Sequence, residues 1–397
     1  MSGRVGDLSK EQAEKLAQFR ENLKDILQEK HTDHYLLRFL RARNFNLKKS
    51  EEMIRKCIDW RIKNKMSTFI QDNPLPEAID KYWPRGQSGV DKEGNLIEIT
   101  NIGSVDPRGV IYSLKSSERE KVFIYLIEIM YYNAKKNSEK QGRYIEGLTI
   151  ILDVDGLGPS ILWKPFISLF NEMMVVMEQY YPETVKRVFI TRPPAMFPLA
   201  YSLVKPFLHE DTKKKVKVLK SSSNWQATLL KYIDADQLPK HWGGTMVDPD
   251  GDPRCPSKLV LGGKVPESYY MKDQLFEEET LTKIVINSGG TKLLKYEVRV
   301  PESAVRYVFK TDEGDITFSI YKRKKSGDEK EWLMEEKSVN CHIIPVDGEI
   351  EAKELGFYVF CFENTSKMKS KTLSYQIDVV EPDEESLEKL AEGDNEK

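Results

Sequence analysis

The first 70 residues carry a helical pattern of hydrophobic positions. These positions recur at spacings of three and four residues: Leu16, Phe19, Leu23 and Ile26. A Ser9-x-x-Gln12 capping box precedes them, a second run spans His34–Arg43, and a third begins near Asn46. We therefore predict a region of packed helices over residues 1–75.

From about Asn95 onward, short β-rich runs alternate with long helical segments. The runs are Leu96–Ile99, Leu148–Leu152 and Val188–Ile190. Such alternation predicts a parallel or mixed sheet covered by helices, here an α/β domain over residues 76–246. Within it, the segment 159–180 is predicted to be a helix with one buried stripe, because its apolar residues step by three and four: Leu162, Phe166, Leu169, Met173, Val176 and Tyr180.

Beyond residue 246 the pattern changes to strands. Prolines and glycines cluster in 247–266, which predicts a linker over residues 247–275. Apolar and polar residues then alternate one by one in 294–300 and 373–379, which predicts a separate all-β sandwich over residues 276–383. The acidic tail, 384–397, has little apolar surface, and we expect a disordered segment or a frayed helical end there.

Charge and composition narrow the classes of partner. The net charge is −2, yet residues 181–220 hold nine basic against three acidic groups. This local excess favours contact with a lipid headgroup or membrane surface and argues against wholesale nucleic-acid binding. The longest uncharged stretch of the first 250 positions has 12 residues, whereas a membrane-spanning helix needs about 20. With four cysteines that form no Cys-x-x-Cys pair, we expect a cytoplasmic chain that visits membranes peripherally.

The segment 196–208 is apolar almost all the way round a helix. Only Ser202 and Lys205 are strongly polar in it. One interpretation is a central helix that neighbours bury on every side. The other is a mobile gate, loosened at its ends by Pro198 and Pro206, with one face on a cavity and the other available to a bilayer. The candidate gate residues are Met196, Phe197, Leu199, Ala200, Leu203, Val204, Phe207 and Leu208.

The free-energy cost of exposing apolar chains to water indicates what such a gate would be for. A buried methylene is worth about 0.8 kcal/mol, so moving a long acyl or isoprenoid chain into water costs roughly 10 kcal/mol or more. A carrier that passes the chain directly from bilayer to cavity avoids this cost. Such a carrier needs an apolar pocket, a gate and a membrane contact, but no catalytic residue. We therefore predict a protein that is not an enzyme and uses no cofactor or metal.

Ordered motifs then connect the chain to a family. They are Leu37-Arg38-Phe39-Leu40-Arg41-Ala42-Arg43-x-Phe45, Asp153-x-x-Gly156, Tyr180-Tyr181-Pro182-Glu183, Lys205-Pro206-Phe207-Leu208 and Leu238-Pro239-x-x-x-Gly243-Gly244. In order and spacing they resemble the CRAL-TRIO lipid-transfer proteins. Together with the sandwich, the chain resembles the supernatant protein factor and tocopherol-associated subgroup, in which a GOLD domain follows the lipid domain. The resemblance implies an N-terminal helical tripod, a lipid cavity floored by the sheet, and a jelly-roll-like GOLD domain.

The resemblance also implies candidate headgroup residues. In members that transfer phosphatidylinositol, four side chains hold the headgroup, and their positions fall here on Arg43, Glu183, Thr212 and Lys215. Arginine and lysine suit a phosphate, while a carboxylate and a hydroxyl suit inositol hydroxyls. The alternative is that Arg43 and Glu183 form a structural ion pair between the helices and the sheet domain.

The phosphatidylcholine site of the family is not reproduced. Its serine and threonine fall on Leu148 and Ile150, and one of its tyrosines falls on Glu98. The resemblance therefore implies a more apolar cavity with Leu148 and Ile150 in its wall, unless these two are ordinary strand core.

A basic run in the predicted sandwich is a further candidate contact. Its four members are predicted at a hairpin tip, either as a solvated loop or as a contact with anionic membranes: Lys322, Arg323, Lys324 and Lys325. The sequence as a whole predicts binding and intermembrane transfer of a hydrophobic lipid, with tocopherol, squalene, a retinoid and a phosphoinositide as candidates. Two alternatives stay open: a lipid-sensing adaptor that recruits protein partners through its GOLD domain, and an accessory factor that delivers an apolar substrate to a membrane enzyme.

Overall fold

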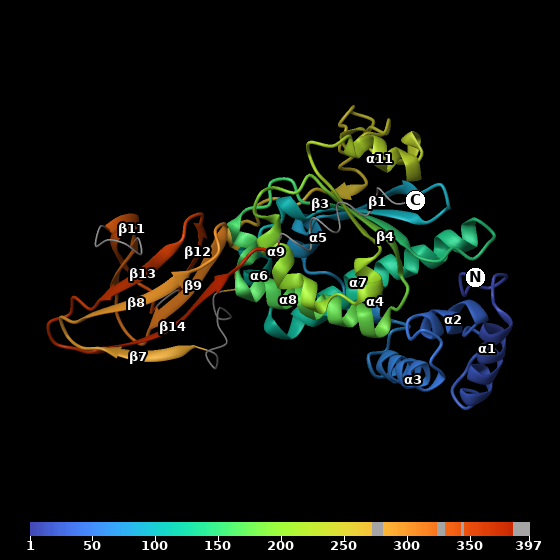
Figure 1. The fold of residues 1–397 in the computed structure, drawn as a ribbon, viewed down its shortest axis with the longest axis horizontal. Coiled ribbons are helices and arrows are strands. Elements are labelled where there is room, and N and C mark those ends of the chain that lie inside the picture. Colours follow the sequence, from blue (N-terminus) through green and yellow to red (C-terminus); the bar gives the residue numbers. More distant parts are fainter. Residues whose placement is uncertain (272–280, 324–329, 343–344, 384–397) are drawn as a thin grey trace.

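The structure is a computed structural model that describes residues 1–271, 281–323, 330–342 and 345–383. Figure 1 shows a row of three parts: the N-terminal helices, a helix-covered sheet, and a β-sandwich at the other end. The acidic tail predicted for residues 384–397 lies outside the described residues.

The N-terminal part is helical, as predicted. Its helices are α1 (Lys10–Asn22), α2 (Asp33–Arg41) and α3 (Leu47–Lys63), followed by the short α4 (Phe69–Asp72) and α5 (Glu77–Tyr82). The capping box at Ser9 is present, and the Asn46 side chain caps α3. Leu16, Phe19 and Leu23 pack with apolar residues of α2 and α3 in one core.

The central sheet is mixed, as the alternation predicted. Its order is β5-β4-β3-β2-β1-β6; strands β2 to β5 are parallel, and β1 runs antiparallel to both of its neighbours. The strands are β1 (Arg85–Val90), β2 (Leu96–Asn101), β3 (Leu148–Asp153), β4 (Val185–Thr191), β5 (Val216–Leu219) and β6 (Leu259–Val260).

Helices cover both faces of this sheet (Figure 1). On one face lie α7 (Ser116–Lys140), α8 (Lys164–Tyr180) and α9 (Phe197–Val204), and on the other lies α11 (Trp225–Tyr232). The short helices α6 (Pro107–Tyr112) and α10 (Glu210–Lys213) complete the domain. Helix α8 begins later than the predicted Pro159, because a separate 3₁₀ turn, η2 (Pro159–Leu162), comes first and Pro165 stands in the first turn of the helix.

The C-terminal part is the predicted all-β sandwich. One sheet has the order β11-β10-β13-β8 and the other β12-β9-β14-β7, and every pairing is antiparallel. The strands are β7 (Thr282–Ile286), β8 (Thr291–Val298), β9 (Ser303–Thr311), β10 (Ile316–Arg323), β11 (Lys330–Val339), β12 (Val346–Ala352), β13 (Gly356–Glu363) and β14 (Lys371–Val380). The residues that alternate in sequence, such as Leu373 and Ile377, face the shared core.

The sandwich docks on the end of the α/β domain that carries α6 and η2. Arg108 of α6 donates from Nε to Asp347 of β12 at 2.6 Å and lies 3.1 Å from Glu349. Arg306 of β9 donates to the carbonyl oxygen of Leu162 at 2.9 Å. Both arginines therefore tie the two parts together by hydrogen bonds, and Ala304 and Val380 of the sandwich pack in the apolar core of the α/β domain.

Candidate functional site

A cavity of about 610 Å³ lies between the central sheet and the helices α7, α8 and α9. Ile97, Ile151 and Phe189 point to the opposite face of the sheet and pack under α11. Successive strand residues point to opposite faces, so one sheet can serve a core and a cavity at the same time. The residues of the cavity floor are Glu98, Thr100, Ile150, Leu152, Val188 and Ile190.

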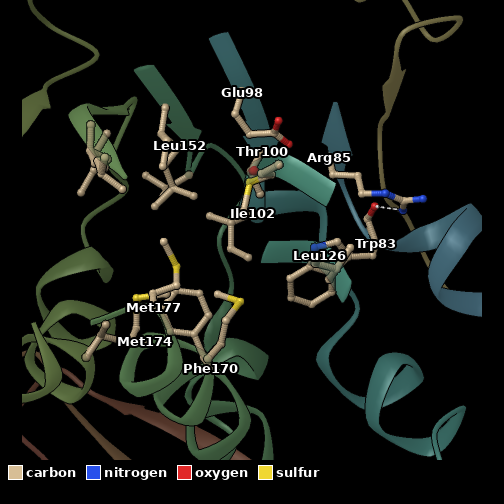
Figure 2. A pocket seen from close by; sticks show the side chains of 18 of the residues that line it. Trp83, Arg85, Glu98, Thr100, Ile102, Leu126, Leu152, Phe170, Met174 and Met177 are labelled. Atoms are coloured by element: carbon tan, nitrogen blue, oxygen red, sulfur yellow. Dashed lines mark hydrogen bonds between the residues drawn. The ribbon is translucent and has the colours of Figure 1, made fainter. Parts of the chain in front are cut away.

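The opposite wall of the cavity is built from flexible apolar side chains of α8. They are Phe170, Met173, Met174 and Met177. Figure 2 shows Phe170, Met174 and Met177 across the cavity from Leu152 and Thr100. Methionine is unbranched and polarizable, so such a wall can adapt to apolar ligands of different shapes.

Helix α8 is held at its two ends by contacts that lie away from the sheet. Before its first residue, the Trp163 ring packs edge-on against Tyr112, with ring centroids 5.4 Å apart. At its last residue, Tyr180 stacks on Trp60 of α3 with centroids 4.2 Å apart. The next residue, Tyr181, donates its hydroxyl hydrogen to Glu128 of α7 at 2.6 Å. Both ends of α8 are therefore held by contacts with elements outside the sheet.

Helix α9 closes one side of the cavity. Of the candidate gate residues, Phe197, Ala200, Val204 and Leu208 line the cavity, as does Tyr201. Leu199 is buried in the adjoining core, Met196 and Leu203 pack against it, and Phe207 is 42% exposed. The α-helix stops at Val204 and continues as a 3₁₀ turn, η3 (Lys205–Phe207), because Pro206 cannot donate a backbone hydrogen bond. The helix thus has an inner face on the cavity and an exposed aromatic ring at its end; its mobility stays a prediction.

The chain that follows β14 lies against α9. Lys205 Nζ is 2.7 Å from Asp383 Oδ2, and the backbone N–H of Asp383 donates to the carbonyl oxygen of Pro198 at 3.4 Å. Pro198 stands in the first turn of α9 and Lys205 follows its last residue. One residue of the C-terminal segment therefore contacts both ends of the helix that covers the cavity.

The four candidate headgroup residues come together in space. Arg43, Glu183, Thr212 and Lys215 line one small recess of about 60 Å³. The recess adjoins the large cavity, because the same residues line both: Met174, Met177, Val185, Leu208 and Thr212.

The ion pair suggested for Arg43 and Glu183 takes a different form. Glu183 lies 3.2 Å from Lys215 Nζ and 3.6 Å from Arg41 Nε. Arg43 instead donates from Nη1 to the carbonyl oxygen of Ala42 at 2.7 Å. Thr212 donates its hydroxyl hydrogen to Glu178 at 2.6 Å. Helix and sheet domain are therefore tied through Arg41, while Arg43 stands in the recess.

The remaining candidates are the strand pair Leu148 and Ile150 and the basic run of the sandwich. Ile150 lines the floor, while Leu148 is buried at the start of the same strand, outside the wall. Lys322 is 4% exposed within β10, where Nζ lies 2.5 Å from Glu354, so the prediction that it stands on a solvent-facing hairpin tip is wrong. Arg323 ends β10 and is half-buried. Lys324 and Lys325 lie outside the described residues.

Among the cavity residues that the sequence did not single out as site residues, Glu98 is the acidic one. Glu98 is 5% exposed and lines the floor, and burial raises the pKa of its carboxyl to about 7. The available signal was a single acidic residue inside an apolar strand, Leu96-Ile97-Glu98-Ile99. In the sequence, Glu98 is otherwise notable only because it stands where the family's phosphatidylcholine site has a tyrosine.

Known proteins resemble this chain over most of its length. The profile described as the CRAL/TRIO domain matches residues 80–244, and the profile described as the CRAL/TRIO N-terminal domain matches residues 12–56. Protein ctg-1 of Caenorhabditis elegans is 29% identical over 356 residues, which span 87% of this chain and 91% of ctg-1. The crystal structure of Sfh5 has 15% sequence identity and a TM-score of 0.44, and the match covers 65% of this chain and 88% of Sfh5. In the part of the chain that the structure describes, no helix is both long and apolar enough to cross a bilayer.

Proposed function

Because this chain belongs to the CRAL/TRIO family, whose members bind and transfer lipids, we propose that it carries a hydrophobic lipid between membranes in the cavity under α9. The observation that carries this proposal is the cavity itself. Its volume of about 610 Å³ lies in the range of sites that enclose small organic ligands, and its wall is dominated by apolar side chains. Burial of a long hydrocarbon chain there would replace its burial in a bilayer.

The proposed route for the lipid passes α9. Phe207, 42% exposed beside the end of α9, offers an apolar contact with the bilayer. The basic residues that follow α9 in the chain, Lys205 and residues 213–215, would favour an anionic surface. With Lys322 buried in an ion pair, we base the proposed membrane contact on α9 and not on the sandwich.

A filled cavity tests this function directly. Ala200 faces the cavity from α9, so Ala200→Trp places an indole where the ligand would lie. We expect wild-type protein to speed transfer of labelled α-tocopherol or squalene from donor to acceptor liposomes, and Ala200→Trp to lose most of that transfer. The matched control is Ala227→Trp, on the exposed side of α11, which should transfer normally. Near-UV circular dichroism confirms that both variants are folded, and full transfer by a folded Ala200→Trp protein would contradict the proposal.

A phosphoinositide is the second candidate ligand, and the recess beside the cavity favours it. Arg43 and Lys215 supply positive charge there, while Glu183 and Thr212 supply groups that suit inositol hydroxyls. In the same assay, the double substitution of Arg43 and Lys215 by alanine should abolish phosphatidylinositol transfer and spare tocopherol. Equal loss of both lipids would assign the two residues to the fold.

The sandwich supports a further candidate function. Its two antiparallel sheets fit the GOLD domain that the motifs implied. Trp332 and Leu333 are exposed on β11, which stands at the edge of its sheet. We keep as the alternative function an adaptor whose sandwich recruits a protein partner while the cavity senses a lipid. Normal liposome transfer by a variant with Trp332→Ser and Leu333→Ser would separate the two activities.

A further inference from the structure

A carboxyl group lies on the floor of the apolar cavity. Glu98 stands in the middle of β2, opposite Ile150 of β3 and Gln87 of β1. Its neighbours in sequence, Ile97 and Ile99, point to the other face of the sheet and are buried under α11. Figure 2 shows Glu98 and Thr100 on the same strand at one end of the cavity, away from the methionines of α8.

Protein groups supply only some of the hydrogen bonds that the Glu98 carboxyl can accept. The backbone N–H of Gly86 donates to Glu98 Oε1 at a long 3.3 Å, and the Gln87 side chain is a second donor. The nearby guanidinium of Arg85 is engaged elsewhere, since it donates to the carbonyl oxygen of Ile79 at 3.1 Å and pairs with Asp80. A carboxylate can accept about four hydrogen bonds, so acceptor capacity is left toward the cavity.

An incompletely satisfied carboxyl is unfavourable in an apolar interior. Burial raises the pKa of Glu98 to about 7, against the opposing influence of the Gln87 and Gly86 hydrogen bonds and the Arg85 charge. Both the protonated and the ionised form are therefore populated near neutral pH. A ligand group that can pair with both forms would remove the penalty for burying this group.

The chemistry of candidate ligands differs at this point. A hydroxyl donates to a carboxylate and accepts from a carboxylic acid, whereas a carbonyl oxygen only accepts. A hydrocarbon offers neither, and a phosphate would be repelled by the ionised form. Thr100 lies two residues along β2 on the same face, and its hydroxyl is a second group at this end of the cavity with which a ligand hydroxyl could form a hydrogen bond.

We propose that Glu98 is the polar anchor of the cavity and that the preferred ligand is a lipid alcohol, a long apolar chain or ring system whose hydroxyl reaches the floor at β2. This inference rests on the proposed lipid-carrier function and narrows its ligand class. It also orients the ligand, because the hydroxyl end would point to β2 and the apolar remainder would lie along the methionines of α8. A phosphoinositide headgroup, by contrast, would occupy the recess at Arg43 and Lys215.

Two probes with one carbon skeleton test the proposal: phytanol and phytane, which differ by a single hydroxyl. Each is equilibrated between liposomes and the purified full-length protein, for the wild type and for Glu98→Leu and Glu98→Gln. Comparing variant with wild type for each probe cancels the different affinities of the probes for the liposomes. We expect Glu98→Leu to weaken phytanol binding about tenfold or more and to leave phytane binding equal or stronger, since a hydrogen bond to a charged group is lost. Glu98→Gln, which keeps polar atoms in the same place, should lose less.

The control and the outcomes separate this inference from the carrier function. Glu139→Gln, on an exposed position of α7, removes one carboxylate outside the cavity and should bind both probes as the wild type does. Binding of phytanol that is unchanged in a folded Glu98→Leu protein, or an equal loss of both probes, would overturn the anchor role and leave the carrier function standing. Failure of the wild type to bind either probe would overturn both.

Discussion

The sandwich and the α/β domain both bury apolar side chains against a sheet, but the sandwich interior is filled whereas the α/β domain contains a cavity. In the sandwich, aromatic rings from both sheets interdigitate: the Phe309 ring lies 4.5 Å from that of Phe318 and 4.8 Å from that of Phe362, centroid to centroid. In the α/β domain, the same kind of surface lines a cavity of about 610 Å³. The difference does not lie in hydrophobicity, because both interiors are apolar.

What differs is the element that sets the spacing between layers. Two sheets approach until their side chains interdigitate, about 10 Å apart. Helix α8 instead is held at its ends by Trp163 and Tyr180, whose partners lie in α6 and in the N-terminal helices. Part of α8 packs in the core through Phe166 and Leu169, while its methionines face the cavity. A binding cavity can thus be built from ordinary core residues when the wall is anchored elsewhere.

The largest effect that tests this comparison is expected in the sandwich. Phe360 of β13 is fully buried among Tyr307, Phe318 and Tyr296. Because Phe360→Ala would open a hole in a packed core, we expect the free energy of unfolding to fall by about 3–5 kcal/mol. Chemical denaturation of the full chain, followed through the sandwich transition, measures it. A loss below about 1 kcal/mol would mean that the sandwich interior is as loosely packed as the cavity.

A pH dependence is expected at the one acidic group of the cavity floor. The pKa of Glu98 is raised from 4.5 to about 7, so the folded state favours the protonated form and loses stability as pH rises through this interval. Relative to wild type, Glu98→Gln should therefore gain roughly 3 kcal/mol of unfolding free energy between pH 4.5 and pH 7. Denaturation at several pH values measures the difference. Glu349, whose pKa is also raised to about 7, is present in both proteins and cancels. Parallel pH curves would show that Glu98 titrates normally.

The smallest effect is expected in the cavity wall. Phe170 of α8 faces the cavity and is half-buried. Since Phe170→Ala would enlarge a space that already exists, we expect a loss of only about 1 kcal/mol, well below that for Phe360→Ala. The same denaturation experiment measures both variants. Comparable losses for the two would break the distinction between core and cavity.

Sequence reasoning succeeded where the determining interactions are local. The capping box at Ser9, the helical stripe of α1 and the alternation around Leu373 are all patterns within a few residues, and each element formed as predicted. It failed for Lys322, since its run of basic residues suggests a loop. In the fold, however, Lys322 meets Glu354, 32 positions later, which sequence alone does not bring into contact.

The cavity and its floor depend on still longer distances. The apolar residues of β3 and α8 could be recognised, but whether they meet in a core or face a space depends on anchors such as Trp60 and Trp163. For the same reason Glu98 could be noticed only as an acidic residue in an apolar strand. Its chemical meaning requires the depth of burial and the positions of Gly86 and Arg85, which the fold supplies.

The contact of Asp383 with both ends of α9 couples two equilibria: the movement of α9 that opens the cavity, and the detachment of the C-terminal segment from α9. In the proposed gating, displacement of α9 breaks the Lys205 pair and the hydrogen bond to Pro198 in the same step that opens the cavity. A factor that binds the C-terminal segment and draws it away from α9 would therefore favour the open cavity. By thermodynamic reciprocity, the free energy by which this factor changes lipid affinity equals the free energy by which bound lipid changes the affinity for the factor. The sandwich would thus influence lipid binding without contacting the lipid.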